Sequence, residues 1–233
     1  MDNDMKRSVV VLGATLGLLG LLMLLFSGGV PMATEQLTDE LGDNSTVIAN
    51  HVTGYEDTSA TITYTAEVDG SVVVLEKRVF DDVTNELETQ IAGESGRVRQ
   101  RVYQTSEITY FGEINENSTY DIQEYDNQYA LATVVYAPTL EYYIANGDYI
   151  QTGESNTYTF SQASEGTPLE SEIDNGNVTN YESTITVDDE QRITQFAVEF
   201  EQSEDDVAQD VVLSLDISGI GESSIPEQTW IEQ

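Results

Sequence analysis

The sequence predicts a mainly β protein of the α+β class, built as an antiparallel sheet with one buried face and one or two packing helices. Three observations support this. Apolar and polar residues alternate over several stretches, which is the period of a half-buried strand. Two shorter stretches carry apolar residues at helical spacing instead. One uncharged run near the N-terminus is long enough to cross a bilayer and predicts a transmembrane helix in front of the sheet.

The uncharged run extends from Ser8 to Ser27 and would span about 30 Å as a helix. Lys6 and Arg7 precede it, so the positive-inside rule places the N-terminus in the cytoplasm and the rest outside, at a cell or virion surface. A signal peptide cleaved near Ser27 is the alternative. The uncleaved reading gives four parts: a cytoplasmic stub (1–7), a signal-anchor (8–27), a linker (28–44) and an external antiparallel β domain (45–233).

Two segments of the external domain predict helices. Ser45 can cap a helix with one apolar face formed by Val47, Ile48, Val52 and Tyr55. His51, the one histidine of the chain, lies on the same stripe, which favours a packed imidazole over a catalytic one. The second helix is expected from Pro138 to Ala145, because proline suits the first turn of a helix and Asn146-Gly147 follows its end.

The strands are predicted by alternation. Asp69-Gly70 joins two such runs, which is a strong hairpin signal. Four to five alternating strands in succession indicate an antiparallel sheet with one buried face. The expected strands are Ile62–Val68, Val72–Phe80, Val98–Tyr103, Glu107–Glu113, Leu131–Tyr136, Tyr149–Ile150, Tyr158–Phe160, Tyr181–Val187, Phe196–Phe200 and Val211–Ile217.

The charge of the chain predicts the solvent in which it works. Asp and Glu number 43 against 8 Lys and Arg, a formal net charge of -35. At physiological ionic strength the self-repulsion amounts to a few kcal/mol, comparable with the stability of a small domain, whereas above 1 M salt it is almost fully screened. The composition is therefore typical of a halophilic protein. The excess of carboxylates also argues against nucleic acid as a partner.

The sequence offers no residues for recognisable catalysis. Cysteine is absent and histidine occurs once, which excludes disulfides, thiol nucleophiles and cysteine-based metal sites. The acidic clusters lack the spacing of an EF-hand calcium loop. We therefore expect no catalytic residue, no metal site and no cofactor, and a chain that is not an enzyme.

Two sets of residues could carry binding or modification. Arg97, Arg99 and Arg101 alternate, so on a regular strand all three would project from one face. They would either pair with acidic side chains on neighbouring strands or form an anion-binding stripe for a lipid headgroup or an acidic partner. Three glycosylation sequons fall in predicted loops, at Asn44, Asn117 and Asn177.

Three runs of the sequence carry a family resemblance: Leu140–Gly153, Asn180–Ile193 and Ile217–Trp230. They resemble parts of a family of haloarchaeal surface lipoproteins of unknown function. That family is similar in architecture to bacterial periplasmic lipoprotein carriers, which implies a curved half-barrel with helices on its concave side. The family's lipobox cysteine is missing here, so anchoring would fall to the peptide segment 8–27.

The resemblance implies an apolar cleft that holds a lipid or another apolar ligand. Its candidate residues are Tyr64, Phe196, Val198 and Phe200 on the alternating apolar face. The alternative is that these residues simply pack against the two helices. A second functional hypothesis is a structural or interaction protein of a cell envelope or virion surface, with an envelope protein as its partner and no small ligand.

Overall fold

A computed structural model describes residues 44–115, 119–126, 129–144, 150–151, 157–162, 177–204 and 207–231. Residues 1–43, which hold the predicted stub, signal-anchor and almost all of the linker, lie outside the described part. Among the described residues, no helix is both long and apolar enough to cross a membrane.

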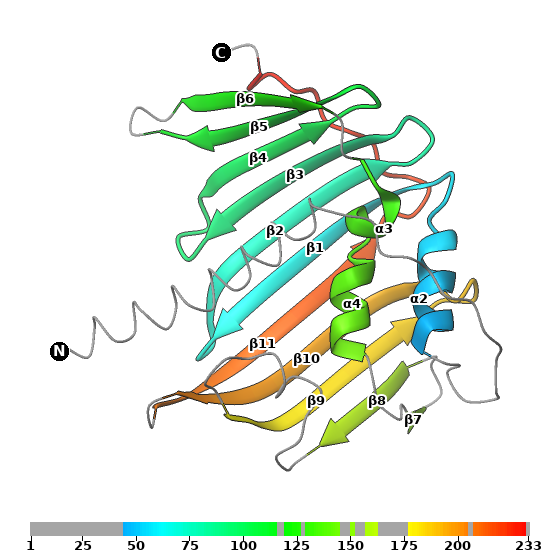
Figure 1. Cartoon of the computed structure of the whole chain (residues 1–233), viewed down its shortest axis with the longest axis vertical. Coiled ribbons are helices and arrows are strands. Elements are labelled where there is room, and N and C mark those ends of the chain that lie inside the picture. Colours follow the sequence, from blue (N-terminus) through cyan, green and yellow to red (C-terminus); the bar gives the residue numbers. More distant parts are fainter. Residues whose placement is uncertain are drawn as a thin grey trace. The chain divides into compact units, whose positions relative to one another are not determined.

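Eleven antiparallel strands form one open, curved sheet, which confirms the mainly β class with few helices (Figure 1). Two meanders build it, and β11 pairs with β1 where they meet. The strands are β1 (Ser59–Val68), β2 (Ser71–Asp81), β3 (Glu86–Gly93), β4 (Val98–Gln104), β5 (Ile108–Ile114), β6 (Tyr120–Asp126), β7 (Ile150–Gln151), β8 (Thr157–Gln162), β9 (Asn177–Val187), β10 (Ile193–Glu204) and β11 (Val207–Ser218). Their order is β6-β5-β4-β3-β2-β1-β11-β10-β9-β8-β7.

The topology explains where the helices lie. The first meander ends at β6, at one edge of the sheet, and the second begins at β7, at the other edge. The chain between them therefore has to travel back across the sheet, and it carries α3 (Leu131–Val134) and α4 (Ala137–Ile144). Together with α2 (Asn44–Thr53), which contacts α4, these helices cover one face of the β1 and β9–β11 region (Figure 1).

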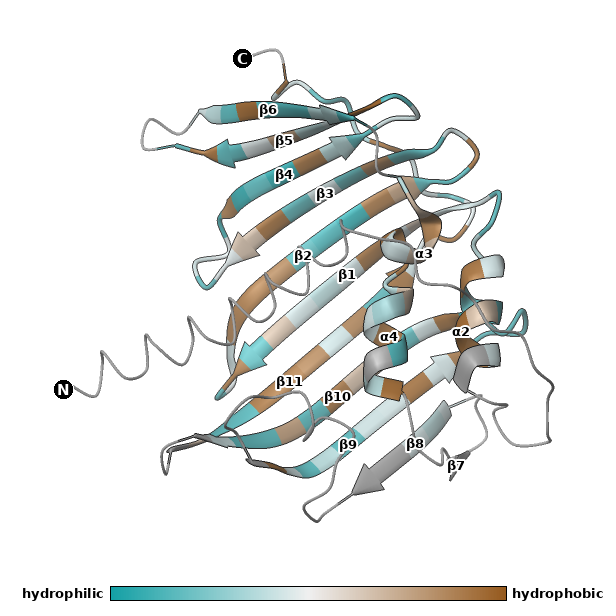
Figure 2. Cartoon of the chain, viewed as in Figure 1, coloured by the Kyte–Doolittle hydropathy of each residue, from teal (hydrophilic) through white to brown (hydrophobic). Residues whose placement is uncertain are grey.

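Most predicted elements are confirmed. Helices α2 and α4 occupy the two segments expected to be helical. The hairpin between β1 and β2 turns at Asp69 and Gly70, whose φ angles of 51° and 71° are those that a two-residue hairpin turn requires. Brown apolar residues alternate with hydrophilic ones along these strands (Figure 2).

One predicted strand is wrong. The run Leu131–Tyr136 is rich in residues that favour strands, yet it forms α3 followed by a turn. The run is the chain's return over the sheet, where tertiary contacts override its β propensity. Arg78 of β2 stabilises the helical conformation of this segment by donating hydrogen bonds to the carbonyl oxygens of Thr133 and Val134. Tyr136 then takes a left-handed φ of 61°, which stops the segment from continuing as an extended strand.

Two strands were not predicted, and each has a physical reason. Strand β3 buries the polar residues Glu88 and Thr89, so its apolar alternation is weak. Strand β6 lies at the edge of the sheet and is exposed along most of its length, so it carries little apolar signal.

The register assigns side chains to two faces of the sheet. We call the side covered by α2, α3 and α4 the helix face; it includes Ile62, Arg78 and Leu215. We call the opposite side the strap face, because residues 219–231, the strap, lie against it. The hydroxyl groups of Thr61 and Ser223 lie 2.9 Å apart, and Thr61 points away from its helix-face neighbour Ile62.

Candidate functional site

The helix face contains the four residues predicted to line an apolar site. Its packing is aromatic: Tyr64 stacks on Tyr136 with ring centroids 5.5 Å apart, and Phe196 lies 6.1 Å from the ring of Tyr143 in α4. The structure therefore places the residues where the packing alternative expects them, and a ligand on this face stays a prediction. All four are buried: Tyr64, Phe196, Val198 and Phe200.

A buried ion pair fastens the helices to this face. The Nε of Arg78 lies 2.7 Å from Oε1 of Glu76, and both side chains are shielded from solvent. The guanidinium also donates from Nη1 to the carbonyl oxygens of Thr133 and Val134, at 2.8 and 3.0 Å, at the end of α3. It lies 3.8 Å from the centroid of the Tyr136 ring, within range of a cation–π contact.

The electrostatics of this cluster keep Arg78 charged. Burial by itself lowers the pKa of Arg78, but the neighbouring Glu76 carboxylate raises it above its ordinary value. Burial raises the pKa of Tyr136 well above 10, against the opposing effect of Arg78, so this phenol stays neutral. Oε2 of Glu76 and the Tyr136 hydroxyl are buried without a hydrogen bond to the described residues. The sequence signal for this cluster was the spacing of Glu76 and Arg78, which occupy the same alternate positions of β2 as the apolar residues Val74 and Phe80.

His51 joins α2 to the rest of the core, as its place on the apolar stripe predicts. Its Nε2 lies 2.8 Å from the carbonyl oxygen of Val135, and its Nδ1 accepts a hydrogen bond from the amide of Ile193 at 3.2 Å. Since one ring nitrogen accepts, the imidazole is neutral with its proton on Nε2. Burial lowers the pKa of His51 to about 4, which agrees with this assignment.

The three alternating arginines do not share one face, so that expectation is wrong. A bulge between Ile91 and Ala92 of β3 leaves Arg99 as the extra residue of β4. The guanidinium of Arg99 comes within 3.3 Å of where a Cβ of Gly93 would lie, on the helix face, and Arg97 precedes the strand.

Arg101 instead points to the strap face, opposite to Arg99, where its Nη1 lies 3.9 Å from Oε1 of Glu88. Cross-strand pairing with an acid therefore describes Arg101. Of the sequon residues, Asn44 begins α2 and Asn177 begins β9, whereas Asn117 lies outside the described residues.

The strap is pinned to the sheet at both ends. At its start the amide of Gly221 donates to the carbonyl oxygen of Ser59 at 2.7 Å. At its end Trp230, 2% exposed, plugs a slot above Gly112. A Cβ on Gly112 would lie 2.5 Å from the indole, so only glycine leaves room for it. Tyr120 of β6 packs beside the indole, with its ring centroid 5.4 Å from that of Trp230.

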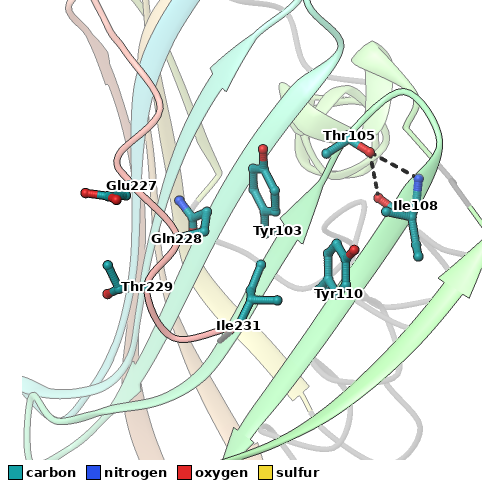
Figure 3. A pocket seen from close by; sticks show the side chains of 8 residues that line it. All are labelled: Tyr103, Thr105, Ile108, Tyr110, Glu227, Gln228, Thr229 and Ile231. Atoms are coloured by element: carbon teal, nitrogen blue, oxygen red, sulfur yellow. Dashed lines mark hydrogen bonds between the residues drawn. The ribbon is translucent and has the colours of Figure 1, made fainter. Parts of the chain in front are cut away.

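Around the Trp230 end, strap residues on both sides of the indole border an open pocket of about 460 Å³ (Figure 3). Its floor is formed by Tyr103 and Tyr110, which are paired directly across β4 and β5, with centroids 6.3 Å apart and ring planes 13° apart. We call this cavity the strap pocket. It is lined by Tyr103, Thr105, Ile108, Tyr110, Glu227, Gln228, Thr229 and Ile231.

The polar groups of the strap pocket are held in place by their neighbours. The Tyr103 hydroxyl donates to Oε1 of Glu86 at 3.0 Å, and burial together with this carboxylate raises the pKa of Tyr103 to about 12. The side-chain oxygen of Gln228 accepts from the Trp230 indole N–H at 2.7 Å. Sequence reasoning missed this pocket, because its two walls are about 120 residues apart in the chain; the lone tryptophan near the C-terminus was the available signal.

No protein-family model and no curated protein matches the sequence. Among solved structures, the chain has some likeness to MucB in complex with MucA(peri), at 10% identity over 78% of this chain and 100% of that chain, with a TM-score of 0.20. A Pseudomonas aeruginosa MucA/MucB complex gives 10% identity over 81% and 100%, again with a TM-score of 0.20. At that score the likeness carries no weight for fold or function.

Proposed function

We propose that this chain is an outward-facing, membrane-anchored binding module of a halophilic surface, with the strap pocket as its binding site. The strap pocket supports the binding role, because two distant parts of the chain form a concavity of the size of small-molecule sites. The acidic surface and the uncharged segment 8–27 support the placement. We propose binding rather than catalysis.

The binding role is tested by site-specific photo-crosslinking. A photoreactive side chain replaces Tyr110 on the pocket floor in the full chain, expressed in its own host membrane. The matched control replaces Tyr125, which is 48% exposed on β6 and does not line the pocket. We expect a discrete adduct from position 110 that is absent from position 125. The same adducts from both positions, or none from either, would contradict the proposal.

The placement has its own test. Fractionation of the host should recover the full-length chain with the membrane. A shortened product in the medium would instead mean that the hydrophobic segment is a cleaved signal peptide.

A second candidate is the apolar ligand site on the helix face, in the manner of a half-barrel lipid carrier. The continuous aromatic surface around Tyr64 and Phe196 favours it, as do the buried polar atoms of Glu76 and Tyr136 that lack a hydrogen bond there. A lipid would have to displace α4 to reach this surface. Native mass spectrometry of protein purified from its host tests the idea, and consistently empty protein would refute it.

The interaction-protein alternative is favoured by the open edge of the sheet. Among the strands that the structure describes, β6 pairs with β5 alone, and it is exposed along most of its length. Crosslinking on intact cells would distinguish this role, because a reproducible protein neighbour at β6 is expected for an envelope or virion component.

A further inference from the structure

We propose that the strap pocket binds a neutral saccharide. This inference rests on the proposed binding role and names its ligand class. The lining combines two aromatic rings, several uncharged hydrogen-bonding groups, one carboxylate (Glu227) and no cationic side chain among its described residues. Each of these features selects for a neutral, polyhydroxylated ring.

The aromatic floor matches the C–H face of a sugar ring. Tyr103 and Tyr110 are direct cross-strand partners, and their rings stack nearly parallel, with planes 13° apart and centroids 6.3 Å apart, so the pocket is bordered by aromatic faces. Figure 3 shows both rings on neighbouring strands beside the strap, with Ile231 close to them. A pyranose has one face of C–H groups that packs on such rings, while its hydroxyl groups point outward to polar partners.

Uncharged polar side chains line the pocket, and hydrogen bonds already orient Gln228 among them. The amide of Gln228 uses one lone pair to accept from Trp230 and one N–H to donate to the carbonyl of Pro226. It therefore keeps a second N–H and a second lone pair for a ligand. The hydroxyls of Thr229 and Tyr110 are further groups that both donate and accept, as the hydroxyls of a sugar require.

The charges around the pocket disfavour other ligands. Glu227 lines it and Glu86 lies behind Tyr103, so an anion would meet two carboxylates and no cation among the lining residues. A cationic ligand would be attracted at low salt, but at 1 M salt the Debye length is about 3 Å and this attraction is screened. Stacking and hydrogen bonding persist in brine, so a neutral ring is the ligand that fits best.

The single tryptophan makes the inference directly measurable. Trp230 is the one tryptophan of the chain, and its indole is hydrogen-bonded to Gln228 of the pocket wall. We would titrate the detergent-solubilised full chain in 2 M KCl with maltose, cellobiose and N,N′-diacetylchitobiose, and follow Trp230 fluorescence. Glucuronic acid and choline serve as anionic and cationic probes. We expect a saturable change with at least one neutral saccharide.

Two variants test whether the change in Trp230 fluorescence comes from a saccharide bound against Tyr110. Tyr110→Ala should weaken saccharide binding about tenfold or more, because it removes one of the two aromatic rings of the pocket. Tyr125→Ala removes an exposed tyrosine outside the pocket and should leave binding unchanged. Circular dichroism of both variants confirms that they remain folded.

The proposal is overturned if no neutral saccharide gives a saturable response, if choline or glucuronic acid binds better than all of them, or if Tyr110→Ala and Tyr125→Ala behave alike. A specific crosslink from position 110 to a lipid or protein would refute the saccharide while leaving the binding role intact. The two proposals therefore fail by different results.

Discussion

The two faces of the sheet are closed in different ways. On the helix face, three helices cover the sheet and form a continuous core that includes an ion pair, Glu76–Arg78, and a neutral histidine, His51. On the strap face, a single segment without helix or strand lies against the sheet and is held by Trp230 at one end and by Gly221 and Ser223 at the other. The helices contribute side chains to the buried core, whereas the strap borders an open pocket beside Tyr103 and Tyr110.

The difference follows from the geometry of the covering element. A helix presents side chains all round and can interdigitate with a sheet to the density of a core. The strap has turns at 220–222 and 229–231 and no helix or strand, and its contacts with the sheet that we describe lie near these two turns. We infer that the helix face carries stability and the strap face carries recognition, and four experiments test this division.

The largest effect is expected at the buried ion pair. Arg78→Met leaves the Glu76 carboxylate buried and unpaired, which should lower the free energy of unfolding by about 3–5 kcal/mol. The double variant Glu76→Leu/Arg78→Met should recover part of this loss, because it leaves no lone charge. The control Lys77→Met changes an exposed neighbour on the other face and should stay within about 0.5 kcal/mol.

Chemical denaturation in high salt measures all three. Equal losses for Arg78→Met and Lys77→Met would mean that the ion pair does not fasten the helix layer.

The next effect is a pH dependence centred on His51. Its pKa is about 4 in the folded chain and 6.5 when unfolded, so below pH 6.5 the unfolded state binds the extra proton. The stability that the buried, neutral His51 contributes is therefore fully present above pH 6.5 and is lost as the pH falls to about 4. The shift corresponds to about 3 kcal/mol.

Because many carboxylates titrate in the same range, the comparison needs a variant without the imidazole. His51→Gln should remove the slope between pH 6.5 and 5 in denaturation midpoints. An unchanged slope would mean that His51 does not set it.

The third effect concerns the strap. Gly112→Ala places a methyl group against the Trp230 indole and should cost about 1–3 kcal/mol or release the strap. Release would shift tryptophan fluorescence to longer wavelength with little change in the unfolding of the sheet. Gly93→Ala is the control, because its Cβ would meet only the movable end of Arg99. A normal fluorescence spectrum for Gly112→Ala would show that the slot is not tight.

The smallest expected effect is a difference in stability between variants of Arg101 and of Arg99. Arg101→Gln breaks the pairing with Glu88 and the 5.6 Å contact with the Tyr120 ring beside Trp230, and should destabilise by about 1 kcal/mol. Arg99→Gln, at the exposed bulge, should stay within about 0.5 kcal/mol. Thermal unfolding measures both, and equal effects would mean that the contacts of Arg101 with Glu88 and Tyr120 add no stability.

Much of the fold was predictable, since alternation reports burial directly. Strands β1, β10 and β11 carry long runs with an apolar residue at every second position, β2 and β9 carry such runs with polar interruptions, and all five were predicted. Strand β3 was missed because its buried positions include Glu88 and Thr89, and β6 because an edge strand needs no apolar face. The run Leu131–Tyr136 was predicted as a strand but forms a helix and a turn. Its local sequence does not reveal that Arg78 donates hydrogen bonds to the carbonyl oxygens of Thr133 and Val134.

The sequence by itself determined the period of the strands, the two main helices, the acidic surface and the burial of Tyr64, Phe196, Val198 and Phe200. These depend on local spacing and composition. The tertiary structure decided which face each arginine takes, because one bulge reverses the side of Arg99. It also decided that Trp230 meets Gly112 and so encloses a pocket. Contacts between residues about 120 positions apart depend on topology, and no local pattern encodes them.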